Sequence, residues 1–279
     1  MSSPPIASPL ALVTGASSGI GQAFAERLGA DGHDLIVVAR RRERLEDLKG
    51  QLESMHGVTV EVLVADLATD AGMAAVDAVA AERPVDILVD NAALAHYMPF
   101  LDLPPERAEE LVRLNALAPL RLIRSALPTM VERGSGTIIS IATQLVFSAT
   151  ADAPQLPRRV VYASTKAFLF MFVRLLAQEL QDTGIRLQVV CPGVVRTEFH
   201  TRQGMDMSHV PRFEPEDVVQ ASLRGLELGE LVCIPGLEDV NQLASHEQAE
   251  VALLLAGLRP PLATRYKVEG GSTAAETPS

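Results

Sequence analysis

The chain has 279 residues, of which 48% are hydrophobic and 21% charged, and its formal net charge is −11. This length and apolar content suit one large α/β domain, and the acidic balance, with one basic run at residues 40–42, excludes nucleic acid and anionic membranes as expected partners. The two cysteines and six scattered histidines have no metal-ligand spacing, so we expect no bound metal. The N-terminus lacks a basic, apolar leader, and no apolar run reaches the roughly 18 residues of a membrane span. We therefore expect a cytoplasmic protein.

A glycine-rich turn follows the first predicted strand. Residues 10–13 form a short apolar run, residues 23–28 have helical spacing, and TGASSGIG lies between them at residues 14–21. Glycines let the backbone turn tightly and approach a phosphate, while the N–H groups at a helix start attract an anion. Any strand–helix turn can use glycine, but this position after the first strand favours a dinucleotide site made by Gly15, Ser17, Ser18, Gly19, Ile20 and Gly21.

Arginines follow the second predicted strand, residues 34–39. In dinucleotide-binding folds an acidic residue at this point holds the ribose 2′-hydroxyl of NAD, whereas an arginine accommodates the 2′-phosphate of NADP. Arg40 and Arg41 are present and the acid is absent, which favours NADP(H). The alternative is a solvated helix start, because residues 43–49 have a charged surface pattern.

The next two predicted strands, residues 58–65 and 85–89, end in further candidate contacts, and residues 69–81 between them are helical. Regular alternation of strand and helix predicts a doubly wound parallel sheet, with its ligand outside the carboxyl ends of the strands. The candidate cofactor contacts at these two ends are Asp66, Leu67, Asn91, Ala92 and Ala93.

The remaining pattern completes a seven-stranded sheet. A helix should begin at Pro105 and run towards Met130, with a kink or opening between Asn115 and Pro119, because proline removes a helix hydrogen bond. Strands are predicted at residues 136–141, 185–190 and 231–234, and helices at 214–228 and 239–258. Residues 201–211 fit either a lid over an apolar ligand or an ordinary surface loop. We predict one Rossmann-type domain over residues 1–267 and a disordered tail over 268–279.

Tyr162 and Lys166 are four residues apart on the predicted helix that follows the irregular linker 145–159, so they share one face. A lysine ammonium within about 4–6 Å favours the phenolate and lowers a tyrosine pKa from about 10, which suits an acid–base catalyst. The same spacing also fits the edge of any amphipathic helix. The glycine turn at residues 14–21 is what favours a catalytic role for Tyr162 and Lys166.

The ordered set of TGASSGIG, Asn91-Ala92, Asn115, a hydroxyl after the fifth strand, YASTK and Pro192-Gly193 with Thr197 resembles the short-chain dehydrogenase/reductase family over residues 10–197. The resemblance implies that Tyr162 exchanges the proton, that Lys166 holds the nicotinamide ribose, and that Asn115 anchors a water of a proton relay. It implies that Thr143 polarises the substrate oxygen. It also places Arg40 and Asp66 at the adenosine, and it places Pro192, Gly193, Val195 and Thr197 around the nicotinamide.

The chain departs from the family pattern at two places. The usual Asn-Asn-Ala-Gly is Asp90-Asn91-Ala92-Ala93, so a methyl group should narrow the cofactor pocket. Thr143 stands where serine is usual, and its 19-residue separation from Tyr162 exceeds the usual spacing. Ser140 and Ser148 therefore stay open as alternative hydroxyls.

We expect an oxidoreductase that moves a hydride between NADP(H) and a small-molecule carbonyl or secondary alcohol. The alternative is a dinucleotide-sensing regulator without turnover, which the two departures support; a methyltransferase would leave Tyr162 and Lys166 unexplained. The helix at residues 161–180 is apolar nearly all round, so its second side needs a partner, and family members pair this helix with its copy. A homodimer or homotetramer is therefore predicted.

Overall fold

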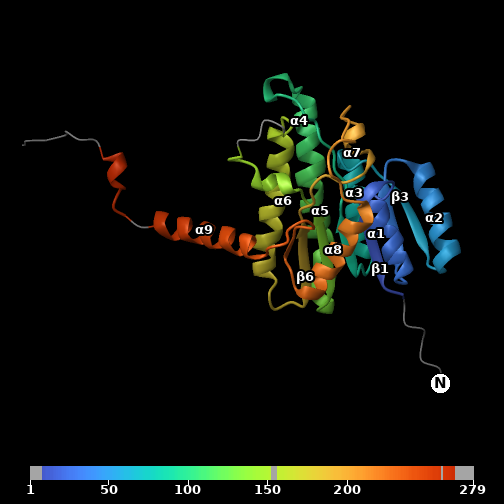
Figure 1. Ribbon diagram of the computed structural model, residues 1–279. Coiled ribbons are helices and arrows are strands. Elements are labelled where there is room, and N and C mark those ends of the chain that lie inside the picture. The colour runs from blue at the N-terminus through green and yellow to red at the C-terminus, as the bar shows by residue number, and fades with distance from the viewer. Residues whose placement is uncertain (1–7, 152–155, 259, 268–279) are drawn as a thin grey trace, which may run out of the picture. The chain divides into compact units, whose positions relative to one another are not determined.

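A seven-stranded parallel sheet organises the structure, a computed structural model that describes residues 8–151, 156–258 and 260–267 (Figure 1). The strand order is β3-β2-β1-β4-β5-β6-β7, so successive crossovers leave β1 in opposite directions. The region outside the carboxyl ends of β1 and β4 is therefore the topological switch point at which such sheets bind ligands. The strands are β1 (Leu10–Thr14), β2 (Asp34–Ala39), β3 (Val60–Val64), β4 (Ile87–Asp90), β5 (Gly136–Ile141), β6 (Ile185–Val190) and β7 (Val232–Cys233).

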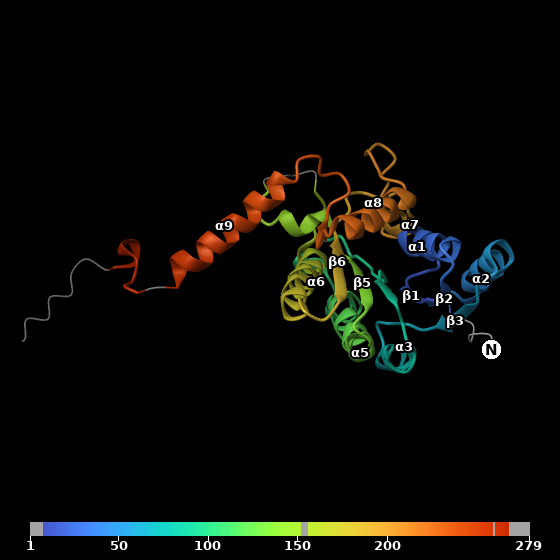
Figure 2. The same ribbon diagram turned by 90° about the horizontal axis from the view of Figure 1, so that it is seen from below.

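Helices cover both faces of this sheet (Figure 2). The layer of α1, α2 and α8 lies on one face, and α3, α5 and α6 lie on the other. Both helix layers bury the central strands, and all five residues of β1 are buried, which explains the apolar run at residues 10–13. The helices are α1 (Gly19–Ala30), α2 (Arg42–His56), α3 (Asp70–Glu82), α4 (Pro105–Val112), α5 (Ala118–Arg133), α6 (Val160–Glu179), α7 (Glu198–Thr201) and α8 (Pro215–Leu228).

The expected opening of the long helix is present between α4 and α5. Residues Arg113–Leu117 form one π-helical segment, η2, and Pro119 lies in the first turn of α5. Proline has no N–H to donate into the preceding turn, so the wider turn accommodates it. Asn115 lies in this segment and is fully buried.

Helix α6 meets the length and composition of a membrane span. It has 20 residues and a mean hydropathy of 1.6, so the expectation that no apolar run reaches that length was wrong. Core helices share this composition; α6 packs against β6, α4 and η2, and its Leu169, Phe170 and Val173 are buried. Its apolar character therefore has a structural reason within the domain.

The compact unit that contains the sheet ends at Gly236, before the domain end expected at residue 267. A second unit begins at Leu237, and its described elements are α9 (Asn241–Gly257) and the short η4 (Thr264–Tyr266). The parallel seven-stranded sheet between helices confirms the predicted fold class. The tail predicted over residues 268–279 lies outside the described residues, as do 152–155 of the linker.

Candidate active site

A cavity of about 940 Å³ lies at the carboxyl ends of the strands. The β1–α1 turn, the exits of β2 to β6, the start of α6 and the segment around α7 all contribute to its walls. Every residue predicted to bind cofactor or take part in catalysis lines it, except Gly21 and Asn115. The sheet topology thus brings together residues from Gly15 to Thr197.

The glycine turn has the shape of a phosphate cradle. Gly15 and Gly19 have φ values of +67° and +59°, which are left-handed conformations that favour glycine. A Cβ at Gly15 would lie 2.6 Å from Asn91 Nδ2, and a Cβ at Gly19 would lie 2.8 Å from Thr197 Cγ2. Only bare backbone fits between these neighbours, and α1 begins there with free N–H groups. These residues fit the pyrophosphate of a dinucleotide.

Thr14 fastens this turn to the end of β4. Its fully buried hydroxyl accepts hydrogen bonds from the N–H groups of Asn91 at 2.9 Å and Ala92 at 3.0 Å. Asn91 Nδ2 donates to the Thr14 carbonyl at 2.9 Å. Ala93 follows and lines the cavity, so its methyl group takes part of the space that glycine would leave open.

Burial sets the acidity of Tyr162. The side chain is only 6% exposed, and burial raises its pKa to about 12, while hydrogen bonds from the hydroxyls of Thr143 and Tyr97 act in the opposite direction. The expectation of a Tyr162 pKa below its usual value was wrong, because the desolvation of a buried phenolate outweighs the hydrogen bonds that favour it. Tyr162 is therefore a protonated phenol at neutral pH.

Lys166 is 2% exposed and donates from Nζ to the Ile141 carbonyl at 2.7 Å. Burial lowers its pKa to about 8, and the charges of Asp90 and Cys191 oppose that shift. Burial also raises the pKa of Asp90 to about 6, against the pull of Lys166. The acid that replaces the family's asparagine is thus a buried counter-charge for the lysine, a role that sequence reasoning missed.

Of the three candidate hydroxyls, only Thr143 lines the cavity and hydrogen-bonds Tyr162. Its Oγ1 also accepts a 3.3 Å hydrogen bond from Leu145 N–H at the start of the short helix η3 (Gln144–Phe147). Ser140 is fully buried in β5, and its Oγ has no hydrogen-bond partner among the described residues. The Ser148 hydroxyl donates to the Leu145 carbonyl at 2.6 Å and accepts from Arg159.

Asn115 does not line the cavity but hydrogen-bonds segments that do. Its amide donates to the Leu94 carbonyl at 2.9 Å and to Thr165 Oγ1 at 3.2 Å, and its carbonyl accepts from Leu94 N–H at 3.1 Å. These bonds tie the loop after β4 to α6. The relay role that the resemblance implies stays a prediction.

Aromatic side chains that sequence reasoning missed surround Tyr162. The Tyr97 ring lies edge-on to it with centroids 5.5 Å apart, and Tyr97 stacks on His200 at 6.1 Å. Phe199, also on α7, lies 5.8 Å from Tyr162. Burial raises the pKa of Tyr97, so its hydroxyl stays a donor to Tyr162. No local motif marks Tyr97, because its partners lie far along the chain.

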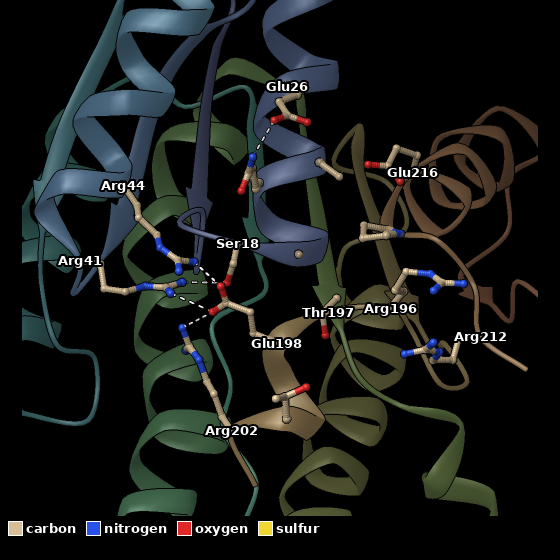
Figure 3. A pocket seen from close by; sticks show the side chains of 15 residues that line it. Ser18, Glu26, Arg41, Arg44, Arg196, Thr197, Glu198, Arg202, Arg212 and Glu216 are labelled. Carbon is tan, nitrogen blue, oxygen red and sulfur yellow. Dashed lines mark hydrogen bonds and ion pairs between the residues drawn. The ribbon is translucent and has the colours of Figure 1, made fainter. Parts of the chain in front are cut away.

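The arginines after β2 have different surroundings. Arg40 is 56% exposed and lies 3.8 Å from Asp66. Arg41 crosses the glycine turn, where its Nη2 donates to Ser17 Oγ at 2.9 Å and to Ser18 Oγ at 2.8 Å. Arg41 also reaches Glu198 on α7 (Figure 3). Arg41 is therefore the arginine that is fixed on the phosphate turn.

The family model described as short chain dehydrogenase matches residues 9–207. A short chain dehydrogenase from Pseudocercospora fijiensis is 37% identical over 192 residues, which are 68% of this chain. The match spans 60% of that relative's length.

Two solved structures are similar over nearly the whole chain. A short-chain dehydrogenase from Sphingobium yanoikuyae in complex with NADPH has a TM-score of 0.87 and 37% identity, covering 92% of this chain and 100% of that one. The bulky-bulky ketone specific alcohol dehydrogenase from Comamonas testosteroni has a TM-score of 0.83 and 32% identity, covering 92% and 98%.

Proposed function

The chain belongs to the short-chain dehydrogenase/reductase family, and on that premise we propose that it is an NADP(H)-dependent oxidoreductase that reduces bulky, largely apolar ketones to secondary alcohols. The observation that carries the proposal is the meeting of Tyr162, Thr143 and Lys166 on one wall of the cavity whose other end is the glycine cradle. A regulator that only senses the dinucleotide would need the cradle but not this wall.

The residues divide between holding a dinucleotide and handling a proton. The backbone of the β1–α1 turn and the start of α1 would hold the pyrophosphate, Asp66 and Leu67 would flank the adenine, and Lys166 would hold the nicotinamide ribose. When bound, the cofactor supplies the hydride. The protein supplies position and electrostatics around the carbonyl.

Thr143 and Tyr162 would bind the carbonyl oxygen between their hydroxyls. Each donates a hydrogen bond to that oxygen, which gains negative charge as the carbonyl carbon is reduced. Tyr162 then releases its proton to the oxygen, which completes the alcohol. A tyrosine whose pKa is raised to about 12 holds this proton at neutral pH, which favours the reductive direction.

Many apolar side chains line the cavity near Tyr162. Met205 and Met207, in the loop after α7, both line it, and methionine adapts to irregular ligands. The similarity to a bulky-bulky ketone specific alcohol dehydrogenase supports a ketone with two large substituents. Further apolar side chains that line the cavity are Leu94, Leu114, Leu145, Leu156, Phe199 and Val210.

A ketone panel tests the proposal. NADPH consumption is followed by absorbance with small aliphatic ketones and with aryl ketones that carry two large substituents, and the Tyr162→Phe variant serves as the inactive control. We expect turnover to increase with substituent size. Binding of NADPH without consumption by any ketone would favour the regulator, and turnover of small ketones alone would contradict the substrate class.

We also propose that the chain self-associates through the outer face of α6. Phe168, Met171 and Leu175 are exposed there, and Val112 of α4 and Leu117 of η2 are exposed on the neighbouring segment. Water contact with this apolar surface is unfavourable, and a second copy would cover it.

A further inference from the structure

One carboxylate holds three arginines at the mouth of the cofactor cavity (Figure 3). Glu198 Oε2 accepts from Arg41 Nη1 at 2.9 Å and from Arg202, and its Oε1 accepts from Arg44. Arg41 and Arg44 come from the β2–α2 region, while Glu198 and Arg202 belong to the α7 segment. The carboxylate is therefore a link between two regions that are more than 150 positions apart in the chain.

This link lies where an adenosine 2′-substituent would be recognised. Arg41 binds Ser17 and Ser18 of the phosphate turn with one end of its guanidinium and Glu198 with the other. Arginines directly after β2 are the groups that take a 2′-phosphate in this class of fold. The cluster thus presents a charge-assisted anion site, and a carboxylate of the protein occupies it.

We infer that Glu198 is a specificity-determining residue, whose carboxylate occupies the site that Arg41 and Arg44 offer to the 2′-phosphate of NADP(H) and must leave when that phosphate binds. The inference rests on the proposed NADP(H) dependence and deepens it. NAD(H) has a hydroxyl at this position, so it can bind while Glu198 stays in place. Glu198 therefore sets how strongly the protein distinguishes the two cofactors.

The charges support an exchange rather than shared binding. Glu198 is ionised at neutral pH, because the hydrogen bond from Arg44 is the main cause that lowers its pKa to about 2. A phosphate monoester carries roughly −1.5 to −2 and bonds arginine forks well. Two anions held by the same guanidinium groups repel each other, so the better-matched phosphate replaces the carboxylate. The side chain of Glu198 is 39% exposed, which leaves it a path into solvent.

The exchange has a consequence at the substrate end. Glu198 begins α7, and the next two residues, Phe199 and His200, lie against Tyr162 and Tyr97. Release of Glu198 removes the ion pairs that tie this four-residue helix to the β2–α2 region. Occupation of the 2′-phosphate position is therefore expected to loosen α7.

Calorimetric titration of NADPH and NADH into the full chain tests the inference. Glu198→Gln keeps the shape and removes the competing charge, so the Kd of NADPH should fall about tenfold while that of NADH stays within about twofold. Glu216→Gln is the matched control, because Glu216 lines the same pocket as Arg41, Arg44 and Arg202 (Figure 3) but makes no hydrogen bond or ion pair with them among the described residues. It should change neither Kd.

The ratio of the NADPH Kd to the NADH Kd shows whether Glu198 competes with the 2′-phosphate or orients the arginines for it. An unchanged ratio in Glu198→Gln, or a loss of NADPH affinity relative to NADH, would show that Glu198 orients the arginines and does not compete. Equal affinity of the parent for both cofactors would refute the proposed cofactor preference, yet the variant would still show whether Glu198 opposes the phosphate.

A second measurement needs no variant. Amide hydrogen exchange over residues 198–202 is compared in the parent with 2′,5′-ADP and with 5′-AMP, which differ in the 2′-phosphate. We expect faster exchange in α7 with 2′,5′-ADP alone, and equal or slower exchange with it would overturn the inference.

Discussion

Replacing Thr143 with valine is the sharpest test of the proposed oxygen chemistry. Valine has the same β-branched shape as the buried threonine, so the variant removes the hydroxyl with little change of shape. The variant loses the hydroxyl that hydrogen-bonds Tyr162 and faces the cavity. Removing one donor to a developing oxyanion typically lowers turnover by about 10²–10³, or about 2.7–4 kcal/mol.

The cost in stability should be much smaller than the cost in turnover. Among the described residues, one backbone group hydrogen-bonds the Thr143 hydroxyl, the Leu145 N–H at 3.3 Å, and losing such a cap costs about 1 kcal/mol. The melting temperature should therefore fall by only a few degrees. Thr143→Ser keeps the hydroxyl and should keep most activity.

The assay measures kcat and KM from NADPH absorbance with a ketone that the parent reduces, alongside the Kd of NADPH. Tyr162→Phe should abolish turnover because it removes the proton, and it should leave NADPH affinity nearly unchanged. Ser140→Ala removes a buried hydroxyl that has no hydrogen-bond partner in the described part of the chain, so its activity should equal that of the parent. If Thr143→Val turned over like the parent while Ser140→Ala or Ser148→Ala lost activity, the assignment of the hydroxyl to Thr143 would be refuted.

Three further outcomes are expected. Tyr97→Phe removes a donor that favours ionised Tyr162, so kcat should fall about tenfold with an unchanged NADPH Kd, and parent-like kcat would exclude a role for that hydroxyl. Asp90→Asn removes the carboxylate that raises the pKa of Lys166. The charged lysine is present below its pKa of about 8 and is lost as pH rises through it, so the alkaline fall of kcat/KM should move to lower pH in the variant. Identical pH profiles of parent and variant would contradict this. Light scattering at micromolar concentration should report a dimer or tetramer for the parent and a smaller species for Phe168→Glu, and a monomeric parent would refute the α6 interface.

Local patterns were enough to predict the framework of this protein. Strand and helix alternate with distinct periods, and positions such as Gly15 and Gly19 require conformations that side chains disfavour, so the parallel sheet and the phosphate turn follow from neighbours in sequence. The four-residue spacing likewise predicted that Tyr162 and Lys166 share a face, because one turn of helix decides it.

Only the tertiary structure decided the electrostatics. A pKa reports the solvent that every surrounding element removes, so the spacing of Tyr162 and Lys166 suggested an acidic phenol, whereas burial raises its pKa to about 12. The same holds for Glu198, which is 154 residues from Arg44 in the chain and has no sequence motif to mark it. Chain topology brings these charges together, and short-range periodicity carries no information about such distant contacts.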